Sequence, residues 1–421
     1  MGERLRIGFI SYTPIQNRWT SSGVAYSMAQ SLSRYCGEVV ELGPFPRPAP
    51  PLLHRIFWKL ERQLTGRSVR WSATRRCCDL AAQMVLQAIE RKPCDLLFVA
   101  LAGWRVATLR HSLPVLVMTD GTLPAMRRMG GYRHVEIMAR RSVCQACALE
   151  REAMHHFTAI ISSSHWAKQS LRHDYDVDED KIFVIRNAAN IEASEVPSLD
   201  EVNGKQCSRD CRLLMVGGPW DRKGGDIVWE TLLALESLGI QAHLTIVGCQ
   251  PPVPLVHPRL NIIPFLDKNK PQEARRLFDL YRKADFFILP SRAEAFGIVY
   301  AEASAFGLPS VATDVGGVSD AVRPNINGIL LPRDAAPGQY AQAIAEIYHD
   351  HARYCRLVRD SRQFFDQELN WDAWGRSVAV CMKKMLPPDL AARVGNRLQA
   401  SDGDDRTCGE GNIDSCSKGV I

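Results

Sequence analysis

The sequence lacks any long apolar run, because none of its 421 residues lie in a stretch of the roughly 18 uninterrupted apolar residues that a membrane-spanning helix needs. It begins Met-Gly-Glu-Arg and enters a strand-like run at Leu5, which leaves no room for a secretory signal peptide. We therefore expect a cytoplasmic protein. No internal repeat is present. No Gly-x-Gly-x-x-Gly follows the first strand, which argues against a Rossmann dehydrogenase.

The 13 cysteines lack the spacing of a metal site. Cys144 and Cys147 form an isolated Cys-x-x-Cys inside a helical pattern, and Cys207 and Cys211 flank a polar stretch. A structural zinc site needs a second pair of ligands at a suitable spacing, and the sequence offers none. We interpret the cysteines as reduced, mostly structural thiols and expect neither a metal nor another cofactor.

Acidic residues are scarce in the first half of the chain. The first 192 residues carry 26 Lys and Arg against 17 Asp and Glu, although the net charge of the whole chain is only +6. Between Arg47 and Arg76, eight basic residues accompany a single acid, Glu61. Such an uneven charge is informative about partners rather than about the fold. We expect no nucleic-acid partner.

Within this basic stretch, residues 51–64 carry apolar side chains at helical spacing and mostly basic residues between them. A cationic amphipathic helix of this kind, within the basic segment 52–76, can lie on an anionic membrane surface. The protein would then sit peripherally at the inner face of the membrane. The alternative, which we favour, is that the apolar side chains face the domain core and the charges face water.

Short apolar strands alternate with helix-length segments in two blocks separated by a polar stretch. The strand candidates are residues 5–10, 96–100, 115–119 and 159–163 in the first block, and 213–216, 243–247, 260–263, 286–289 and 310–312 in the second. Alternating strands and helices form parallel sheets covered on both faces, so the fold class is α/β. Each block predicts one doubly wound, Rossmann-like domain, with ligands at the carboxyl ends of its strands.

The same pattern predicts the domain boundaries. The expected organisation is an N-terminal domain over 1–192, a linker over 193–210, a C-terminal domain over 211–370, a helix over 371–386 that packs back on the first domain, and a disordered tail over 387–421.

Two glutamates flank a glycine turn in the second block. Glu294 follows the strand 286–289, Gly297 falls at the strand-to-helix turn, and Glu302 lies about one turn inside the next helix. Such a turn presents free backbone N–H groups that suit a phosphate, and carboxylates are natural acceptors for vicinal sugar hydroxyls. Two isolated glutamates would favour a pair of surface acids, but the intervening Phe296-Gly297 favours a site.

The segment Glu294–Glu302 matches the E-x7-E signature and resembles the retaining glycosyltransferases of family 4, which have the GT-B fold of two Rossmann-like domains facing a cleft. The resemblance covers most of the chain up to about Met385 and is strongest from Leu213 to Pro332. It implies a retaining hexosyltransferase that uses a nucleotide-diphospho-sugar and a saccharide or lipid-linked acceptor in cell-surface polysaccharide or glycolipid assembly. A non-catalytic nucleotide-sugar-binding partner of the same fold is the alternative.

The resemblance also implies roles for single residues. Glu294 would contact hydroxyls of the donor sugar and Glu302 the ribose, while Phe296, Gly297 and Ile298 would form the phosphate-binding turn. A sugar-nucleotide epimerase of the same fold fits this context less well. No residue is a convincing nucleophile for a covalent intermediate, so the resemblance implies displacement on one face of the sugar, with the leaving phosphate helping to deprotonate the acceptor.

A second Gly-rich turn follows the strand 213–216 and ends in Arg222-Lys223-Gly224. A diphosphate leaving group gains negative charge as the glycosidic bond breaks, and fixed cations stabilise it. By resemblance Lys223 is the diphosphate ligand. The family often carries an arginine where this chain has Gly218, and Arg222 is a candidate substitute. A solvated basic turn is the alternative.

The N-terminal block contributes weaker matches. Gly23 matches a loop glycine near the donor phosphates, with Ser22 or Thr20 as possible hydrogen-bond donors. Asp120 follows the strand 115–119 and is the candidate contact for the donor sugar or the acceptor hydroxyl, although it could equally cap a turn. Further matches follow other strand ends: Ser163, Ser164, Trp166, Asn187 and Asn190.

Overall fold

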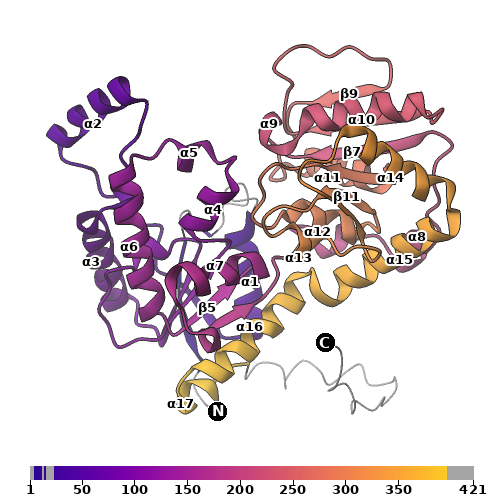
Figure 1. The fold of residues 1–421 in the computed structure, drawn as a ribbon. Helices are drawn as coiled ribbons and strands as arrows, with labels where there is room; N and C mark the ends of the chain where they lie inside the picture. The colour runs from indigo at the N-terminus through magenta and orange to yellow at the C-terminus, as the bar shows by residue number, and fades with distance from the viewer. Residues whose placement is uncertain (1–3, 12–13, 16–22, 396–421) are drawn as a thin grey trace.

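The structure, a computed structural model, describes residues 4–11, 14–15 and 23–395 and consists of two α/β lobes (Figure 1). The N-terminal lobe contains a six-stranded parallel sheet of order β2-β1-β3-β4-β5-β6. Its strands are β1 (Arg6–Ile10), β2 (Glu38–Glu41), β3 (Leu96–Ala100), β4 (Val115–Thr119), β5 (Ala159–Ser162) and β6 (Ile182–Val184).

The C-terminal lobe contains a second six-stranded parallel sheet, of order β12-β11-β10-β7-β8-β9. Its strands are β7 (Cys211–Val216), β8 (Ala242–Val247), β9 (Leu260–Ile263), β10 (Phe286–Leu289), β11 (Ser310–Thr313) and β12 (Gly328–Leu331). The predicted α/β fold class is confirmed. The strand order reverses between β7 and β10, and a reversal of this kind opens a ligand crevice at the carboxyl ends of the strands.

Helices connect the strands in both lobes. They are α1 (Val24–Tyr35), α2 (Leu52–Thr65), α3 (Arg75–Arg91), α4 (Leu123–Met129), α5 (Arg133–Glu136), α6 (Arg140–His156), α7 (His165–Tyr175), α8 (Leu199–Asn203), α9 (Trp220–Lys223), α10 (Gly225–Ser237), α11 (Pro271–Lys283), α12 (Ile298–Ala305), α13 (Val318–Ala321), α14 (Pro337–His349), α15 (His351–Glu368), α16 (Trp371–Met385) and α17 (Pro388–Ala391).

Helix α16 follows the C-terminal lobe in the chain but covers one face of the N-terminal sheet (Figure 1). Its buried side chains Trp374 and Val378 join the core that contains Phe9 and Phe98. The rings of Phe98 and Trp374 meet edge to face with their centroids 6.0 Å apart, a favoured arrangement of aromatic rings. The chain therefore crosses between the lobes twice.

The ordered chain continues beyond the start of the expected tail. Helix α17 occupies Pro388–Ala391, and Val394 is buried against the N-terminal lobe. The guanidinium of Arg393 donates to both carboxylate oxygens of Asp95, at 2.8 and 3.0 Å. The expectation of disorder from residue 387 is therefore wrong for this first part, because it ignored these two anchors. Residues 396–421 lie outside the described residues.

Helix α2 extends away from the N-terminal lobe (Figure 1), and none of its residues is buried. Leu53 and Leu64 are about four-fifths exposed, at 80% and 81%. Its apolar side chains therefore do not face the core. The favoured interpretation, that these side chains pack on the domain core, is wrong, because helical periodicity does not reveal which element covers the apolar face. No helix within the described ranges is long and apolar enough to cross a membrane.

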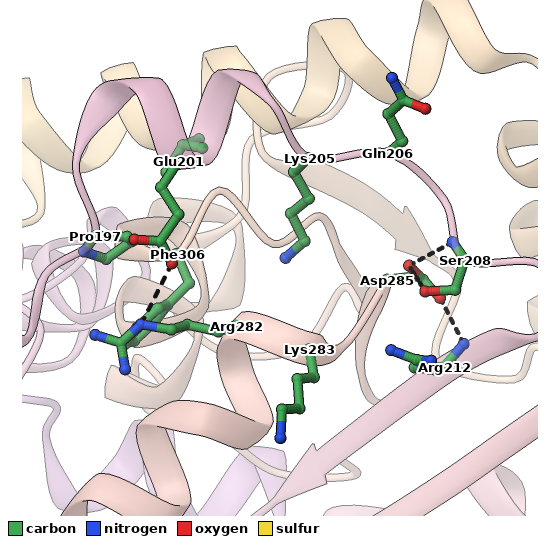
Figure 2. A pocket seen from close by; sticks show the side chains of 11 residues that line it. Pro197, Glu201, Lys205, Gln206, Ser208, Arg212, Arg282, Lys283, Asp285 and Phe306 are labelled. Carbon is green, nitrogen blue, oxygen red and sulfur yellow. Dashed lines mark hydrogen bonds and ion pairs between the residues drawn. The ribbon is translucent and has the colours of Figure 1, made fainter.

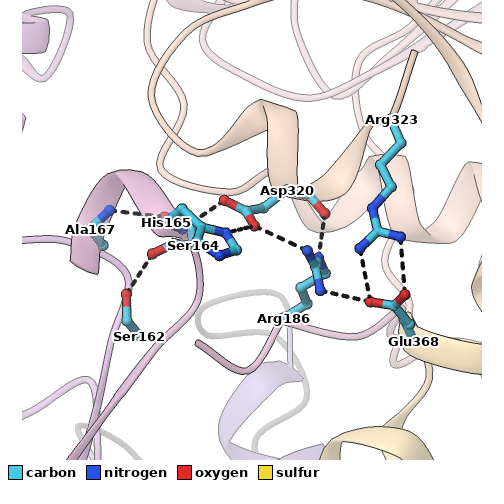
Figure 3. Close-up of polar contacts among 8 residues, drawn as sticks. All are labelled: Ser162, Ser164, His165, Ala167, Arg186, Asp320, Arg323 and Glu368. Carbon is cyan, nitrogen blue, oxygen red and sulfur yellow. Dashed lines mark hydrogen bonds and ion pairs between the residues drawn. The ribbon is translucent and has the colours of Figure 1, made fainter. Parts of the chain in front are cut away.

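A polar network joins the two lobes (Figure 3). The buried carboxylate of Asp320, on α13, accepts hydrogen bonds from the backbone N–H of His165 and from its ring Nδ1, both at 2.7 Å. Arg186 donates to the backbone oxygen of Asp320 at 3.0 Å and to Glu368 at 2.6 Å. Glu368 also pairs with Arg323. The charges of this network are mutually compensated.

Candidate functional site

The turn between β10 and α12 has the conformation that its glycine allows. Gly297 adopts a φ of 87° immediately before α12, a left-handed conformation that favours glycine. A Cβ at this position would lie 2.5 Å from Cδ2 of Tyr300, so a side chain does not fit. The turn leaves the first N–H groups of α12 without partners inside the helix. Phe296, just before the turn, is buried in the core.

The carboxylate of Glu294 contacts the second Gly-rich turn. Its carboxylate accepts a hydrogen bond from Nζ of Lys223, and both side chains are largely buried. Arg222 lies 3.6 Å from the same carboxylate oxygen and donates to the backbone oxygen of Ala293 at 2.9 Å. Burial lowers the pKa of Lys223, and the charge of Glu294 partly opposes that fall. Residues about 70 positions apart thus form one charged cluster.

Packing explains why this chain has Gly218 where the family often carries an arginine. A Cβ on Gly218 would lie 2.8 Å from the backbone oxygen of Gly248, so this loop conformation does not accept a side chain there. Arg222 instead supplies a second cation from α9. Its guanidinium carbon lies 5.2 Å above the ring of Tyr132, a cation–π distance. Because Tyr132 belongs to the N-terminal lobe, Arg222 contacts both lobes.

Glu302 is fully buried and lies in a separate polar contact. Its carboxylate accepts hydrogen bonds from Nζ of Lys268 and from the hydroxyl of Tyr281, the latter at 3.2 Å. Among the described residues, no hydrogen bond or ion pair joins it to the cluster of Glu294, Arg222 and Lys223. Sequence reasoning missed Lys268 and Tyr281. The only available signal for Lys268 was its place in the loop after β9, at the same edge of the sheet.

Asp120 lies at the carboxyl end of β4, on the other side of the interface between the lobes. Its Oδ1 accepts a hydrogen bond from Nδ2 of Asn187 at 2.9 Å. Burial raises the pKa of Asp120, and the negative charge of Glu294 raises it further, while the bond from Asn187 opposes the rise. This effect of Glu294 on the pKa of Asp120 indicates that the two candidate carboxylates, one from each lobe, lie in the same region. The Oδ1 of Asn187 is buried without a hydrogen-bond partner in the described chain.

The remaining N-terminal candidates have different surroundings. Gly23 precedes α1 with a φ of 82°, while Thr20 and Ser22 lie outside the described residues. Ser164 caps α7 by accepting a hydrogen bond from the N–H of Ala167 at 3.2 Å, a structural role. Asn190 accepts hydrogen bonds from Ser27 and Trp371. This residue therefore connects α1 to α16.

The lobes pack closely beside Glu294. The N–H of Gly317 donates to the backbone oxygen of Glu294 at 3.2 Å. A Cβ on Gly316 would lie 2.0 Å from that oxygen and 2.8 Å from Sδ of Met129, in the other lobe. A Cβ on Gly131 would lie 2.5 Å from Cβ of Ala293. Glycines at these positions permit the close approach. Among the described residues, no three His, Cys, Asp or Glu side chains gather as metal ligands.

Solved structures share this two-lobed fold over nearly the whole chain. Sucrose-phosphate synthase from Thermosynechococcus elongatus superimposes with a TM-score of 0.63 at 17% identity, covering 90% of this chain and 99% of that one. Anabaena HepE in complex with UDP and glucose superimposes with a TM-score of 0.59 at 15% identity, covering 90% and 99%. The protein has the GT-B fold, with two Rossmann-like lobes and the candidate residues where the lobes meet.

Sequence comparisons show similarity to glycosyltransferases. Residues 210–350 match the family described as glycosyl transferases group 1. The D-inositol 3-phosphate glycosyltransferase of Xylanimonas cellulosilytica is 28% identical over 229 residues, 51% of this chain and 54% of that protein. A protein of the same name from Corynebacterium glutamicum is 27% identical over 278 residues, 62% and 64% of the two chains. The chain thus spans between about half and two thirds of these relatives. These matches confirm the resemblance to glycosyltransferases of the family 4 type, and the family match itself lies in the C-terminal lobe.

Proposed function

We propose that the protein transfers a sugar from a nucleotide-diphospho-sugar to an acceptor hydroxyl. The observation that carries this proposal is the buried cluster of Lys223, Arg222 and Glu294, which lies where the strand order of the C-terminal sheet reverses. The two cations would hold the diphosphate, the N–H groups after Gly297 would bind its oxygens, and Glu294 would accept hydrogen bonds from the sugar. The Lys223–Glu294 pair would separate when the donor binds.

The remaining roles complete this donor site. Glu302 would accept hydrogen bonds from the ribose after exchanging Lys268 or Tyr281 for ligand hydroxyls, and Gly23 would leave room for the donor phosphates. Asp120 would contact the donor sugar or the acceptor hydroxyl. The unpartnered Oδ1 of Asn187 beside Asp120 supports a polar ligand at that place, because buried polar atoms normally have partners.

The test is to incubate the purified protein with UDP-, GDP- and ADP-sugars and to follow release of the nucleoside diphosphate. Lys223→Met should lower the rate by about 10²–10³-fold, the usual effect of removing one group that stabilises transition-state charge. Lys270→Met, an exposed lysine in the same lobe, should retain the rate. Binding of a nucleotide sugar without release or transfer would instead identify a non-catalytic partner of the same fold.

We further propose that transfer retains the anomeric configuration. A same-face displacement assisted by the leaving phosphate fits the cationic cluster of Lys223 and Arg222. Nuclear magnetic resonance of the first product, before mutarotation, would give its anomeric configuration, and an inverted anomer would exclude this mechanism. Because Lys223 and Arg222 would neutralise the diphosphate, transfer should continue in EDTA. Loss of activity that Mg²⁺ restores would exclude metal-independent transfer.

We also propose that the acceptor is lipid-linked or lies at an anionic membrane surface, as in polysaccharide or glycolipid assembly. Helix α2 supports this proposal, because its apolar side chains Leu53, Ile56 and Phe57 are exposed beside basic ones. Such a helix lies in the interface of an anionic bilayer. Because the curated relatives are named for D-inositol 3-phosphate, that compound belongs in the panel of acceptors.

Liposome flotation tests the membrane role. The variant with Arg55, Lys59 and Arg62 changed to Glu should lose binding to vesicles of phosphatidylglycerol, because charge attraction to the surface reverses. A matched variant with Arg275, Arg276 and Lys283 changed to Glu, on α11, alters the same number of charges away from α2. If both variants float like the wild type, α2 does not bind membranes.

A further inference from the structure

A cavity of about 260 Å³ lies on the C-terminal lobe (Figure 2), and none of the candidate donor-site residues lines it. It opens at the amino ends of β7 and β10, between the segment after α8 and the last turn of α11. The donor cluster lies at the carboxyl ends of the same two strands, so the two sites are at opposite edges of one sheet. Its charged lining residues are Glu201, Lys205, Arg212, Arg282, Lys283 and Asp285.

Lys205 is the unusual member of this lining. Its side chain points into the cavity (Figure 2), and its Nζ is shielded from solvent yet has no hydrogen-bond partner within the described chain. Burial lowers the pKa of Lys205 to about 8, against the opposing charge of Asp285. Burying an ammonium without a partner is costly, so this atom is poised to donate to a ligand.

Asp285 does not serve as that partner. One of its oxygens accepts from the N–H and the hydroxyl of Ser208, at 3.0 and 3.1 Å. The other accepts from the N–H of Arg212 at 2.7 Å. These bonds hold the carboxylate on the loop before β7 and the start of that strand (Figure 2). They leave the ammonium of Lys205 without a hydrogen bond.

The other cations differ in how far they are already engaged. Arg282 is satisfied by the backbone oxygen of Glu195 at 2.7 Å and lies 3.5 Å from the carboxylate of Glu201. It also sits, like Lys283, in the last turn of α11, where cations compensate the helix dipole. That explanation does not extend to Lys205 or to Arg212, whose side chain is exposed on β7. Arg282 is also paired with Glu195 and Asp279, whereas Lys205, Arg212 and Lys283 form no ion pair among the described residues, so the cavity favours an anion.

We propose that this cavity binds a small molecule that carries a phosphate group, with Lys205 as its central donor and Arg212 at its mouth. A phosphate accepts several charge-assisted hydrogen bonds at once and would supply the partner that Nζ lacks. The volume is just below the range of about 300–1,000 Å³ typical of drug-sized ligands. It therefore suits a compound of the size of a sugar monophosphate and not a nucleotide sugar.

Isothermal titration in a phosphate-free buffer would test this with two probes, inorganic phosphate and a hexose 6-phosphate. Both should bind the wild type, and Lys205→Met should weaken each by at least tenfold. Lys223→Met, in the donor cluster, and the exposed Lys270→Met should bind both probes as the wild type does. Tighter binding of the hexose phosphate would identify a phosphorylated metabolite as the ligand, and equal binding would identify free phosphate.

The proposal would be overturned by no binding of either probe, by unchanged binding in Lys205→Met, or by loss of binding in Lys223→Met alone. The Lys205→Met variant should fold, because it removes a buried charge without a hydrogen bond. If it does not, Arg212→Gln, at an exposed position, should weaken binding severalfold. Sulfate, whose charge is constant over this range, should bind the wild type progressively more weakly from pH 7 to 9. A flat profile, like unchanged binding by Arg212→Gln, would reject the site.

Discussion

The buried carboxylate of Glu302 depends on Lys268 for charge compensation. Lys268→Met would leave that charge with only the hydroxyl of Tyr281, and removing one member of a buried pair typically costs about 3–5 kcal/mol. We expect a loss at the lower end, about 3 kcal/mol, because the lysine is 24% exposed. Urea unfolding would measure it. Lys270→Met, nearby in the same loop and exposed, is the control and should change stability little. Equal stability of the two variants would contradict this account.

The two aspartates Asp120 and Asp174 should have opposite effects on pH-dependent stability. Burial raises the pKa of Asp120, so the folded state retains a proton that the unfolded chain releases above about pH 4. Its contribution to stability is therefore lost as pH rises through the folded pKa. Asp120→Asn should gain stability relative to the wild type at neutral pH, and this gain should vanish at low pH.

Asp174 is the matched case, because its pKa is shifted in the opposite direction. The hydrogen bond from Arg128 lowers its pKa, so its contribution is present above about pH 4 and is lost as pH falls through the folded pKa. Asp174→Asn should therefore be less stable than the wild type at neutral pH and equal to it in acid. Denaturation curves between pH 3 and 8 would compare the three proteins. Parallel profiles for both variants would refute the assignment.

Individual residues were predictable where a local pattern carried them. Gly297 and Lys223 stand in turns that directly follow strands, so the chain itself places them at the carboxyl edge of the sheet. Lys268 also lies in the loop after a strand, but its importance, like that of Tyr132, comes from contacts with residues far away in the sequence. Asp120 lies between these cases. Its strand end was readable, but its partner Asn187 comes from another strand end that only the folded sheet brings near.

At the scale of the element, the turn into α12 supports a sharp test. Gly297→Ala would place a Cβ within 2.5 Å of Tyr300 at a φ of 87°. Strained residues of this kind cost about 1–3 kcal/mol, and a shifted turn would move the phosphate-binding N–H groups. We expect lower stability and weaker binding of the nucleoside diphosphate, read by thermal shift with and without ligand. Gly239→Ala, also at positive φ but in open space, separates the strain from the site.

The strands of the two sheets followed from their short apolar runs, since buried parallel strands are almost continuously hydrophobic. The edge strands β2 and β12 offer only two or three consecutive apolar residues and were missed, and β6 was missed although it is continuously apolar. The surroundings of helix α2 could not be predicted from the sequence either. Its periodicity indicates an amphipathic helix, but the same periodicity suits a helix on a core and a helix on a membrane. Only the three-dimensional structure shows that its apolar face has no covering element within the described chain.

At the scale of the whole molecule, the network around Asp320 holds the lobes in their present arrangement. Asp320→Ala would remove the acceptor of His165 and one partner of Arg186. We expect the lobes to separate more readily, so that the radius of gyration from small-angle X-ray scattering increases and a nucleotide sugar reduces it again. Asp366→Ala, which breaks an exposed pair within α15, should leave it unchanged. An unaltered radius in both variants would show that other contacts hold the lobes.

The two crossings between the lobes lie side by side, because the N–H of Ala189 donates to the carbonyl of Leu369 at 2.9 Å. The C-terminal lobe is thus an insertion within the N-terminal one, and the two segments that connect the lobes are adjacent. A fragment from Pro197 to Glu368 would therefore begin and end at neighbouring points and should fold as an independent nucleotide-binding unit. The rest of the chain can be rejoined by a short Gly-Ser linker. The N-terminal lobe would then keep α16 on its sheet, and acceptor binding could be measured without the donor site.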